Sequence, residues 1–160
     1  SNLSTLTILT QSTNRSVAIA ISSGVGAPPQ DWPLWRALDS HLSEEAFCRA
    51  AQGQMTRWIK TDGGIVGILR YQLFWETIPF LTLLLLKEAH RRQGFGRAAM
   101  ALWESELVRA GHRMVLVSTR ADESAQHFYR TLGYRDCGCL LLDAPGYGQP
   151  AELFLSKPLP

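Results

Sequence analysis

A short apolar run, a turn rich in glycine and arginine, and a helix follow one another in the middle of this chain. Residues 81–86 are all leucine or threonine, a run too short to cross a membrane and of the length expected for a buried strand. After the turn at residues 90–97, apolar side chains recur at helical spacing from Phe95 to Leu107, and Gly111 stands where a helix commonly ends. This unit constrains the fold more than any other feature, because the rest of the chain has to pack around it.

The turn is suited to an anionic ligand. Gly94 and Gly96 lack a Cβ atom, so a ligand can approach the backbone closely, and the first N–H groups of the helix have no partner within it. Arg91, Arg92 and Arg97 cluster around the same turn. Together these features predict a phosphate-binding site.

Two other interpretations of the turn are weighed against this one. The pattern Gly94-x-Gly96-x-x-Ala99 also fits a dinucleotide fingerprint. However, the next strand ends without the acidic residue that would bind a ribose, and too little chain follows for a second nucleotide-binding half. The third interpretation is a purely structural turn, in an interaction module that has no cofactor.

A second pattern lies downstream, where a capped helix is expected to precede a strand. Its side chains Ala125, Phe128, Tyr129 and Leu132 share one helical face, and a glycine marks its end. The chain resembles the GNAT superfamily of acyl-CoA-dependent N-acyltransferases in two motifs, Arg91-x-x-Gly94-x-Gly96 and Ala125-x-x-Phe128-Tyr129-x-x-Leu132-Gly133-Tyr134. They stand in the family's order and separation. The resemblance runs from about residue 55 to 156 and implies an N-acetyltransferase.

The resemblance implies an α+β fold, in which a mixed, mostly antiparallel central sheet splays at the cofactor site and helices flank it. A single GNAT-like domain is expected over residues 1–160. Apolar patterning agrees with the family's order of two strands, short helices, three strands, helix, strand, helix and two strands. We expect strands at 3–9, 16–22, 55–60, 65–74, 81–86, 113–118 and 135–142, a polar turn at 10–15, a loop at 24–30, and helix starts at Asp31 and Ser43.

Acetyl-CoA is the co-substrate that the resemblance implies. In such proteins the pantetheine arm bonds to strand backbone as an added strand would, and the pyrophosphate binds the N–H groups of the turn. Asp122 replaces an asparagine that is common in the family, and we expect it to cap its helix, with a cofactor contact left open. The cofactor-binding residues expected on this basis are Leu84, Leu85, Leu86, Arg91, Arg92, Gln93, Gly94, Phe95, Gly96, Arg97, Asp122 and Tyr129.

Catalytic roles also follow from the resemblance. Tyr129 matches the family's general-acid tyrosine, which protonates the leaving thiolate, and the backbone N–H of Leu84 is expected to bind the oxyanion. Because Tyr129 falls on the apolar face of its own helix, a packing role is the alternative. The strand before the turn offers no carboxylate, so Glu76 in the preceding hairpin is the candidate general base. Deprotonation through ordered water, or binding of a neutral amine, are alternatives to such a base.

The acceptor pocket is expected between the early helices and the last hairpin, with Trp32, Trp35, Asp39, Glu76 and Tyr147 as its residues. Two tryptophans three residues apart on a helix also fit a packing role. A carboxylate there could pair with an ammonium group, so a small amine, an amino acid and a peptide amine are all compatible acceptors. The implied reaction is direct attack of the amine on acetyl-CoA in a ternary complex. The alternative is a CoA-binding sensor or scaffold with impaired catalysis.

Composition narrows the classes of partner. The chain is 46% hydrophobic and carries a formal net charge of +2 over 160 residues, so no general attraction to nucleic acid or to membranes is expected. Its three cysteines predict a reducing compartment, and hence a cytoplasmic protein. Cys137 and Cys139 share one strand face but lack a second pair of ligands, so no metal site is expected. Neither a signal peptide nor a membrane-spanning run is expected, and a homodimer is left open.

Overall fold

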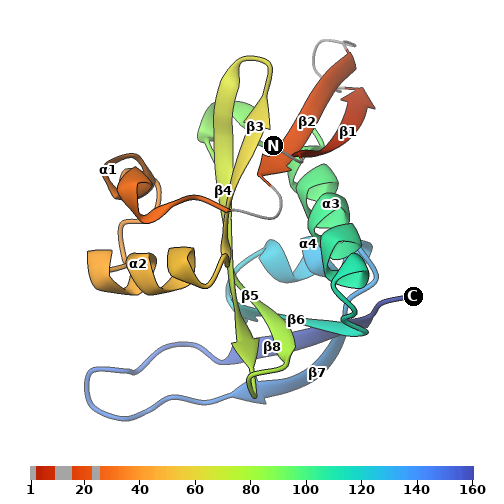
Figure 1. Ribbon diagram of the computed structural model, residues 1–160. Helices are drawn as coiled ribbons and strands as arrows, with labels where there is room; N and C mark the ends of the chain where they lie inside the picture. Colours follow the sequence, from red (N-terminus) through yellow and green to blue (C-terminus); the bar gives the residue numbers. More distant parts are fainter. Residues whose placement is uncertain (1–2, 10–15, 23–25) are drawn as a thin grey trace.

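The computed structural model describes residues 3–9, 16–22 and 26–160. Within them, eight strands form one sheet in the order β1-β2-β3-β4-β5-β6-β8-β7, with helices on both faces (Figure 1). The strands are β1 (Leu3–Leu9), β2 (Ser16–Ser22), β3 (Thr56–Thr61), β4 (Gly64–Phe74), β5 (Ile78–Leu86), β6 (Met114–Arg120), β7 (Arg135–Leu140) and β8 (Glu152–Pro158). The helices are α1 (Trp32–Trp35), α2 (Glu44–Gln52), α3 (Phe95–Arg109) and α4 (Ala125–Thr131), with short 3-10 turns η1 (Pro29–Asp31) and η2 (Glu88–His90).

The order of strands and helices predicted from the sequence is confirmed. The bounds differ at several ends. The strand β5 begins at Ile78 rather than at residue 81, α1 has only four residues, and α4 begins at Ala125 rather than directly after Asp122. Gly111 and Gly133 follow their helices with φ of +93° each, the left-handed conformation that glycine adopts at helix ends. The turn predicted at 10–15 and part of the loop predicted at 24–30 lie outside the described residues.

The strands β5 and β6 form the only parallel pair of the described sheet, and they pair over a very short length. Phe80 faces Leu116 and Leu81 faces Val117, after which the two strands separate. On its other edge β5 stays paired with β4 as far as Leu86. Beyond its two pairs with β6, the edge of β5 that faces β6 therefore has no strand partner within the described part of the chain, and the predicted splay is confirmed.

A β-bulge lies where the splay begins. The register between β4 and β5 shifts after Arg70, which leaves Thr82 as an extra residue on β5. The Thr82 hydroxyl donates to the backbone carbonyl of Arg70 and accepts from its guanidinium, both at 3.0 Å. Arg70 also donates to the Asp39 carboxylate at 2.9 Å in a nearly buried ion pair. The bulge is thus held by polar contacts that reach across to the segment after α1.

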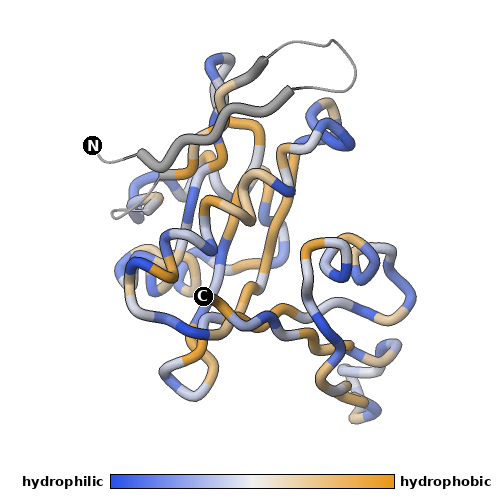
Figure 2. The backbone as a smooth tube through the Cα atoms, turned by 90° about the vertical axis from the view of Figure 1, so that its right-hand side faces the viewer, coloured by the Kyte–Doolittle hydropathy of each residue, from blue (hydrophilic) through white to orange (hydrophobic). Residues whose placement is uncertain are grey.

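Two separate hydrophobic cores cover the two faces of the sheet. The larger core joins α3 and α4 to the sheet and includes Trp103 and Val117. The smaller core joins α1 and α2 to β3 and β4, where the Trp35 ring lies 5.1 Å from Phe47 and 5.0 Å from Trp58, measured between centroids. Figure 2 shows hydrophobic residues gathered along the central strands and hydrophilic ones mostly in the turns. Among the described helices, none is both long and apolar enough to cross a membrane.

Candidate functional site

The turn between β5 and α3 leaves a helix N-terminus open. Gly94 is the N-cap of α3 with φ of +89°, a conformation that costs glycine little. Glycine has no side chain with which to cap the helix, so the N–H groups of the first turn receive no side-chain acceptor from it. Gly96 is closely packed, because a Cβ atom there would lie 3.4 Å from the Phe128 ring and 3.6 Å from Leu86. At Gly94 the left-handed conformation disfavours any residue that carries a Cβ atom.

A cavity of about 950 Å³, the larger cavity, lies beside this helix N-terminus. Its walls come from the end of β5, the turn, and the start of α4. Its volume is within the range of ligand-binding sites, and it brings together all the predicted cofactor residues except Gln93, Phe95 and Asp122. The lining residues are Leu84, Leu85, Leu86, Arg91, Arg92, Gly94, Gly96, Arg97, Glu123, Ser124, Ala125, Phe128 and Tyr129.

The three predicted cofactor residues outside the larger cavity have other contacts. Phe95 is 3% exposed and belongs to the core, so only its backbone is available to a ligand. The Gln93 amide donates to a backbone carbonyl of η2 at 2.9 Å, which braces the turn. Asp122 accepts two bonds from Arg120, at 3.0 and 2.8 Å. The N-cap of α4 is Ser124, without a side-chain cap bond, so the predicted capping role of Asp122 is wrong.

Three arginines give the larger cavity a positive rim. Arg91, Arg92 and Arg97 are all exposed and line it. The Nε of Arg91 donates to the carbonyl of Leu86 at 3.1 Å, which ties the turn to the end of β5. Arg97 donates to the Thr131 hydroxyl at 3.3 Å, which links α3 to α4. Cations beside a helix N-terminus suit a polyphosphate group.

Tyr129 of α4 lies in the inner wall of the larger cavity. The residue is 7% exposed, and its ring centroid lies 5.2 Å from that of Phe128 and 5.7 Å from that of Tyr134. Burial raises the pKa of its phenol to about 12. The phenol is therefore fully protonated at neutral pH, and it is available as a donor rather than as a base.

A second cavity, the smaller cavity, has a volume of about 290 Å³ and lies where β5 and β6 separate. Leu84, Glu123, Ala125 and Tyr129 line both cavities. Tyr129 therefore stands where the two cavities meet. The other lining residues of the smaller cavity are Leu81, Thr82, Leu83, Ser118, Thr119, Arg120 and Glu152.

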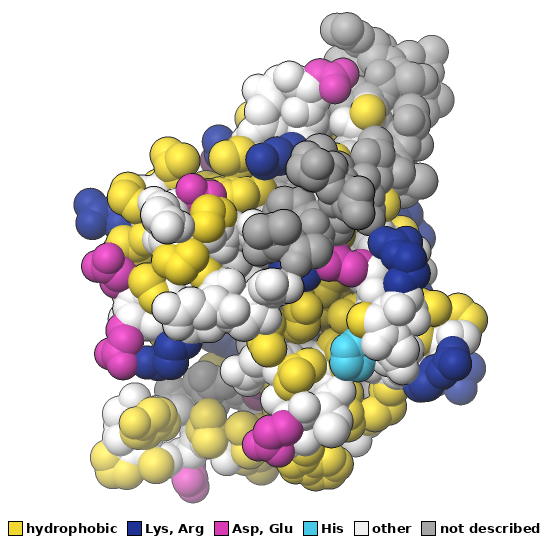
Figure 3. Space-filling model, viewed as in Figure 1, with side chains coloured by type: hydrophobic (Ala, Val, Ile, Leu, Met, Phe, Trp, Pro, Cys, Tyr) yellow, Lys and Arg dark blue, Asp and Glu magenta, His cyan; other side chains and the backbone are white. Residues whose placement is uncertain are grey.

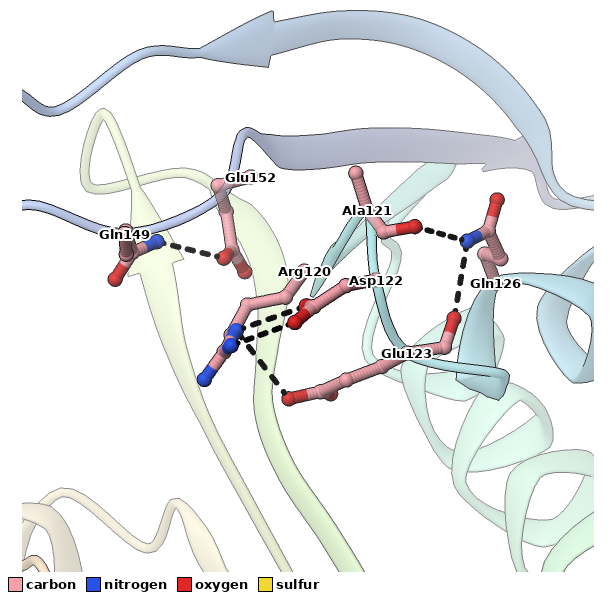
Figure 4. A network of polar contacts seen from close by, with 7 residues as sticks. All are labelled: Arg120, Ala121, Asp122, Glu123, Gln126, Gln149 and Glu152. Carbon is pink, nitrogen blue, oxygen red and sulfur yellow. Dashed lines mark hydrogen bonds and ion pairs between the residues drawn. The ribbon is translucent and has the colours of Figure 1, made fainter.

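Charged side chains from β6, β8 and the segment before α4 gather at the smaller cavity (Figure 4). Arg120 donates to Asp122 and lies 3.7 Å from the Glu123 carboxylate. Glu152 pairs in register with Arg120 across β6 and β8 and points toward it, while it accepts from Gln149 at 3.1 Å. No motif of the sequence marks Glu123 or Glu152 as a site residue. Only the pairing of β6 with β8 brings Glu152 here.

Three of the predicted acceptor residues lie on the α1 side of the sheet, outside both cavities. Trp35 is fully buried, and its indole N–H donates to Asp39 at 3.0 Å. Asp39 is 5% exposed and holds Arg70 at the bulge. Trp32 is half-buried, and its ring centroid lies 5.4 Å from that of Phe47. Packing and support of the bulge account for these three residues.

The other two predicted acceptor residues lie on the surface. Glu76 is exposed in the turn between β4 and β5, with φ of +59°. Tyr147 is 68% exposed in the connection between β7 and β8, and Trp75 and Leu141 are exposed in the same two segments. Figure 3 shows hydrophobic side chains gathered along this lower edge of the molecule. None of these four residues lines either cavity.

Comparison with protein families gives one match, to a family described as "Acetyltransferase (GNAT) family". It covers residues 27–134, and so contains β5, the arginine turn, α3, β6 and α4. No curated protein matches the chain in sequence.

Solved structures of acetyltransferases share the fold. Ard1 from Thermoplasma volcanium matches with a TM-score of 0.73 and 16% identity, over 89% of this chain and 98% of that chain. The ribosomal-protein-S18-alanine N-acetyltransferase from Escherichia coli matches with a TM-score of 0.70 and 20% identity, over 88% and 94%. Arabidopsis thaliana Naa50, in complex with the bisubstrate analogue CoA-Ac-MVNAL, matches with a TM-score of 0.69 and 11% identity, over 87% and 97%. At these identities the likeness concerns the fold alone.

Proposed function

The chain belongs to the GNAT acetyltransferase family, and on this premise we propose that it transfers the acetyl group of acetyl-CoA to an amine by direct attack within a ternary complex. Its enzyme class is acyl-CoA-dependent N-acetyltransferase. One observation carries the proposal: Tyr129 is a buried phenol at the junction of two cavities, and the larger of them has a rim of arginines beside a helix N-terminus.

The larger cavity fits acetyl-CoA in charge and in backbone geometry. The pyrophosphate would bind at the N-terminus of α3, where Arg91, Arg92 and Arg97 supply positive charge and the two glycines leave the backbone accessible. The pantetheine arm would bond to the unpaired edge of β5 at residues 84–86, as an added strand does. One cavity thus brings together the residues proposed to bind the pyrophosphate and those proposed to bind the pantetheine arm.

The acetyl group arrives activated as a thioester, and residues of the chain assist its transfer. The neutral amine attacks the carbonyl carbon, a C–N bond forms, the C–S bond breaks, and the sulfur leaves as a thiolate. The backbone N–H of Leu84 is proposed to bind the oxyanion that forms during attack. The nitrogen loses one proton and the sulfur gains one, so the charges balance.

Tyr129 is proposed to donate a hydrogen bond to the leaving sulfur. Its pKa of about 12 lies well above that of an ordinary thiol, about 8.5, so complete proton transfer from the phenol to the thiolate is uphill. A hydrogen bond from a buried donor still stabilises the negative charge that develops on the sulfur. The role of Tyr129 is therefore to stabilise the leaving thiolate while it keeps its own proton, and the thiolate takes up through solvent the proton that the nitrogen releases.

The general base stays a prediction. Glu76 is the candidate from the sequence, but it is exposed and lines neither cavity. A base must lie within hydrogen-bonding reach of the amine, directly or through one water. This geometry favours deprotonation through ordered water, or binding of an amine that is already neutral.

Binding of acetyl-CoA tests the cofactor site. We propose calorimetry on the wild type and on an Arg92→Gln/Arg97→Gln variant, since glutamine removes the charge and keeps a long polar side chain on the same backbone. At roughly 1 kcal/mol for each exposed charge pair, affinity should fall by about 30-fold. An Arg36→Gln/Arg49→Gln variant removes two exposed arginines that do not line the cavity and should leave affinity unchanged.

Release of free CoA thiol in the presence of a panel of amines tests the transfer step. Thiol release that requires both substrates is expected of a transferase. Binding without thiol release for every amine would favour the alternative, a CoA-binding sensor or scaffold. No binding at millimolar acetyl-CoA would mean that the glycine turn is purely structural, and the proposal would fail.

A single domain acting in the cytoplasm is proposed as well. Cys48, Cys137 and Cys139 are all free thiols, as expected in a reducing compartment. Acceptors are proposed to be small-molecule or peptide amines. Light scattering would decide between a monomer and a homodimer.

A further inference from the structure

We propose that the smaller cavity binds the acceptor, and that Glu152 and Thr119 make it selective for an ammonium group with no carboxylate beside it. The inference rests on the proposed function, because it concerns the second substrate of the same reaction. The chemical class is a primary amine whose neighbouring groups are neutral or cationic. Two sources supply such a group, namely an alkylamine and the N-terminus of a peptide.

Thr119 carries a buried hydroxyl that has no hydrogen-bond partner among the described residues. The residue is 5% exposed, and its Oγ1 makes no hydrogen bond to any described group. It lines the smaller cavity together with Tyr129. Because an unpaired hydroxyl in the interior destabilises a folded protein, native structures rarely keep one. A polar group bound in the cavity would supply the missing partner.

The charges around the smaller cavity are unbalanced toward negative. Arg120 is the only cation among the described residues that line it, and Asp122 and Glu123 already engage it at 2.8 and 3.7 Å. Glu152 accepts instead from the neutral amide of Gln149. Three carboxylates therefore surround one guanidinium (Figure 4). A second cation would balance the cluster, and the ammonium group of an acceptor is such a cation.

The position of the smaller cavity fits an acceptor of acetyl transfer. Leu84 and Tyr129 line both cavities, so an amine seated in the smaller one meets the larger one at the residues assigned to the oxyanion and to the leaving sulfur. A volume of about 290 Å³ lies just below the usual range for ligand sites, which begins at about 300 Å³. The cavity thus suits an alkylamine or one terminal residue, with Leu81 and Leu83 available to pack against its carbon chain.

A carboxylate on the carbon next to the amine would be repelled by Glu123 and Glu152. A methylene or an amide at the same place would not. Repulsion of the wrong ligand is a common source of specificity. We therefore expect discrimination between molecules that differ by this single carboxylate, for which butylamine with norvaline, and alaninamide with alanine, are matched pairs that carry one amine each.

Initial rates of thiol release with these two pairs, at saturating acetyl-CoA, form the test. The wild type should prefer the carboxylate-free member of at least one pair by about tenfold in kcat/KM. The butylamine pair reports a small-molecule acceptor, and the alaninamide pair reports a peptide N-terminus. Glu152→Gln should raise the KM of the preferred amine about tenfold and reduce the preference, with kcat and acetyl-CoA affinity nearly unchanged. Glu45→Gln removes an exposed carboxylate of α2 and should change none of these values.

The hydroxyl of Thr119 is tested by two substitutions. Thr119→Val removes the hydroxyl at nearly constant shape, and Thr119→Ser keeps it. Because Oγ1 makes no hydrogen bond within the described protein, Thr119→Val should raise the KM of the amine several-fold without lowering Tm. Thr119→Ser should restore the KM. A loss of Tm in Thr119→Val with unchanged KM would show that the hydroxyl is structural.

The possible failures are distinguishable. If amines react but Glu152→Gln keeps the same preference, or if the carboxylate-bearing members are preferred, the inference is overturned while the proposed function stands. If no member of either pair reacts, the proposed selectivity is wrong, and the wider amine panel decides the function. Absence of thiol release with that whole panel overturns both.

Discussion

Replacing Tyr129 by phenylalanine removes one oxygen from the junction of the two cavities and leaves the ring in place. The ring contacts with Phe128 and Tyr134 do not involve the hydroxyl, so the fold should be kept. A hydrogen bond to a charged group contributes about 1.5–3 kcal/mol. At 1.4 kcal/mol for each factor of ten, kcat should fall by about 10- to 150-fold. The KM for acetyl-CoA should change little, because the bond forms fully only as the sulfur leaves.

The pH dependence of this loss separates the phenol from a solvent-exposed acid. Because the pKa of Tyr129 is about 12, its hydroxyl stays protonated across pH 6 to 9, and the ratio of wild-type to variant kcat should be constant there. The assay is thiol release with both substrates saturating. A ratio that falls as pH rises within this range would contradict the role of a buried, protonated donor.

Tyr134→Phe is the matched control for this substitution. Its hydroxyl is also buried and makes no hydrogen bond to a described group, and it lines neither cavity. Removing an unpaired buried hydroxyl should leave kcat unchanged and stability equal or higher. The reasoning fails if Tyr129→Phe keeps kcat within twofold of the wild type, or if Tyr134→Phe loses as much activity as Tyr129→Phe.

Two further predictions concern stability, and urea unfolding measures both. Asp39→Asn should lower the free energy of unfolding by about 3 kcal/mol, because it leaves the Arg70 guanidinium without its buried counter-ion. The control Glu45→Gln, at an exposed pair, should have no measurable effect. Equal effects of the two substitutions would show that the buried pair stabilises the fold no more than the exposed one. Between about pH 10 and 12 the unfolded chain loses its phenol protons, while Tyr129 in the folded chain keeps its own. The Tyr129 phenol therefore contributes fully to the free energy of unfolding below pH 10, and this contribution is lost as pH rises to 12. Tyr129→Phe should therefore reduce the fall in stability from pH 8 to pH 11 by about 1.4 kcal/mol, and an unchanged fall would mean that the phenol is not buried.

The elements around the larger cavity were predictable because their signals are local. A leucine run, a glycine pair and a helical period lie within about 30 consecutive residues, and they indicate a strand, a turn and a helix in that order. Gly94 adopts a left-handed conformation that few other residues tolerate, so its place in the sequence indicates a helix start. The resemblance to a known family then supplied the splay of β5 and β6, which no local pattern contains.

The smaller cavity was not predictable in the same way. Glu152 is opposite Arg120 only because β8 pairs with β6, and a register between strands so far apart in sequence has no local signature. Asp39 and Trp35 were expected at an acceptor, since a helical period shows which residues share a face but not what that face meets. In the structure they meet each other and Arg70. Asp122 pairs with Arg120 two residues away, a contact that competes with capping.

The polar chain from Asp39 through Arg70 to Thr82 has a consequence for directed evolution of the enzyme. It joins the core under α1 to a residue that lines the smaller cavity, by way of the neighbouring strands β4 and β5. A substitution that shifts α1 will therefore move the cavity wall although it touches no substrate. Libraries selected for new acceptors should yield beneficial mutations beneath α1 as well as at the cavities, and screens limited to lining positions will miss them.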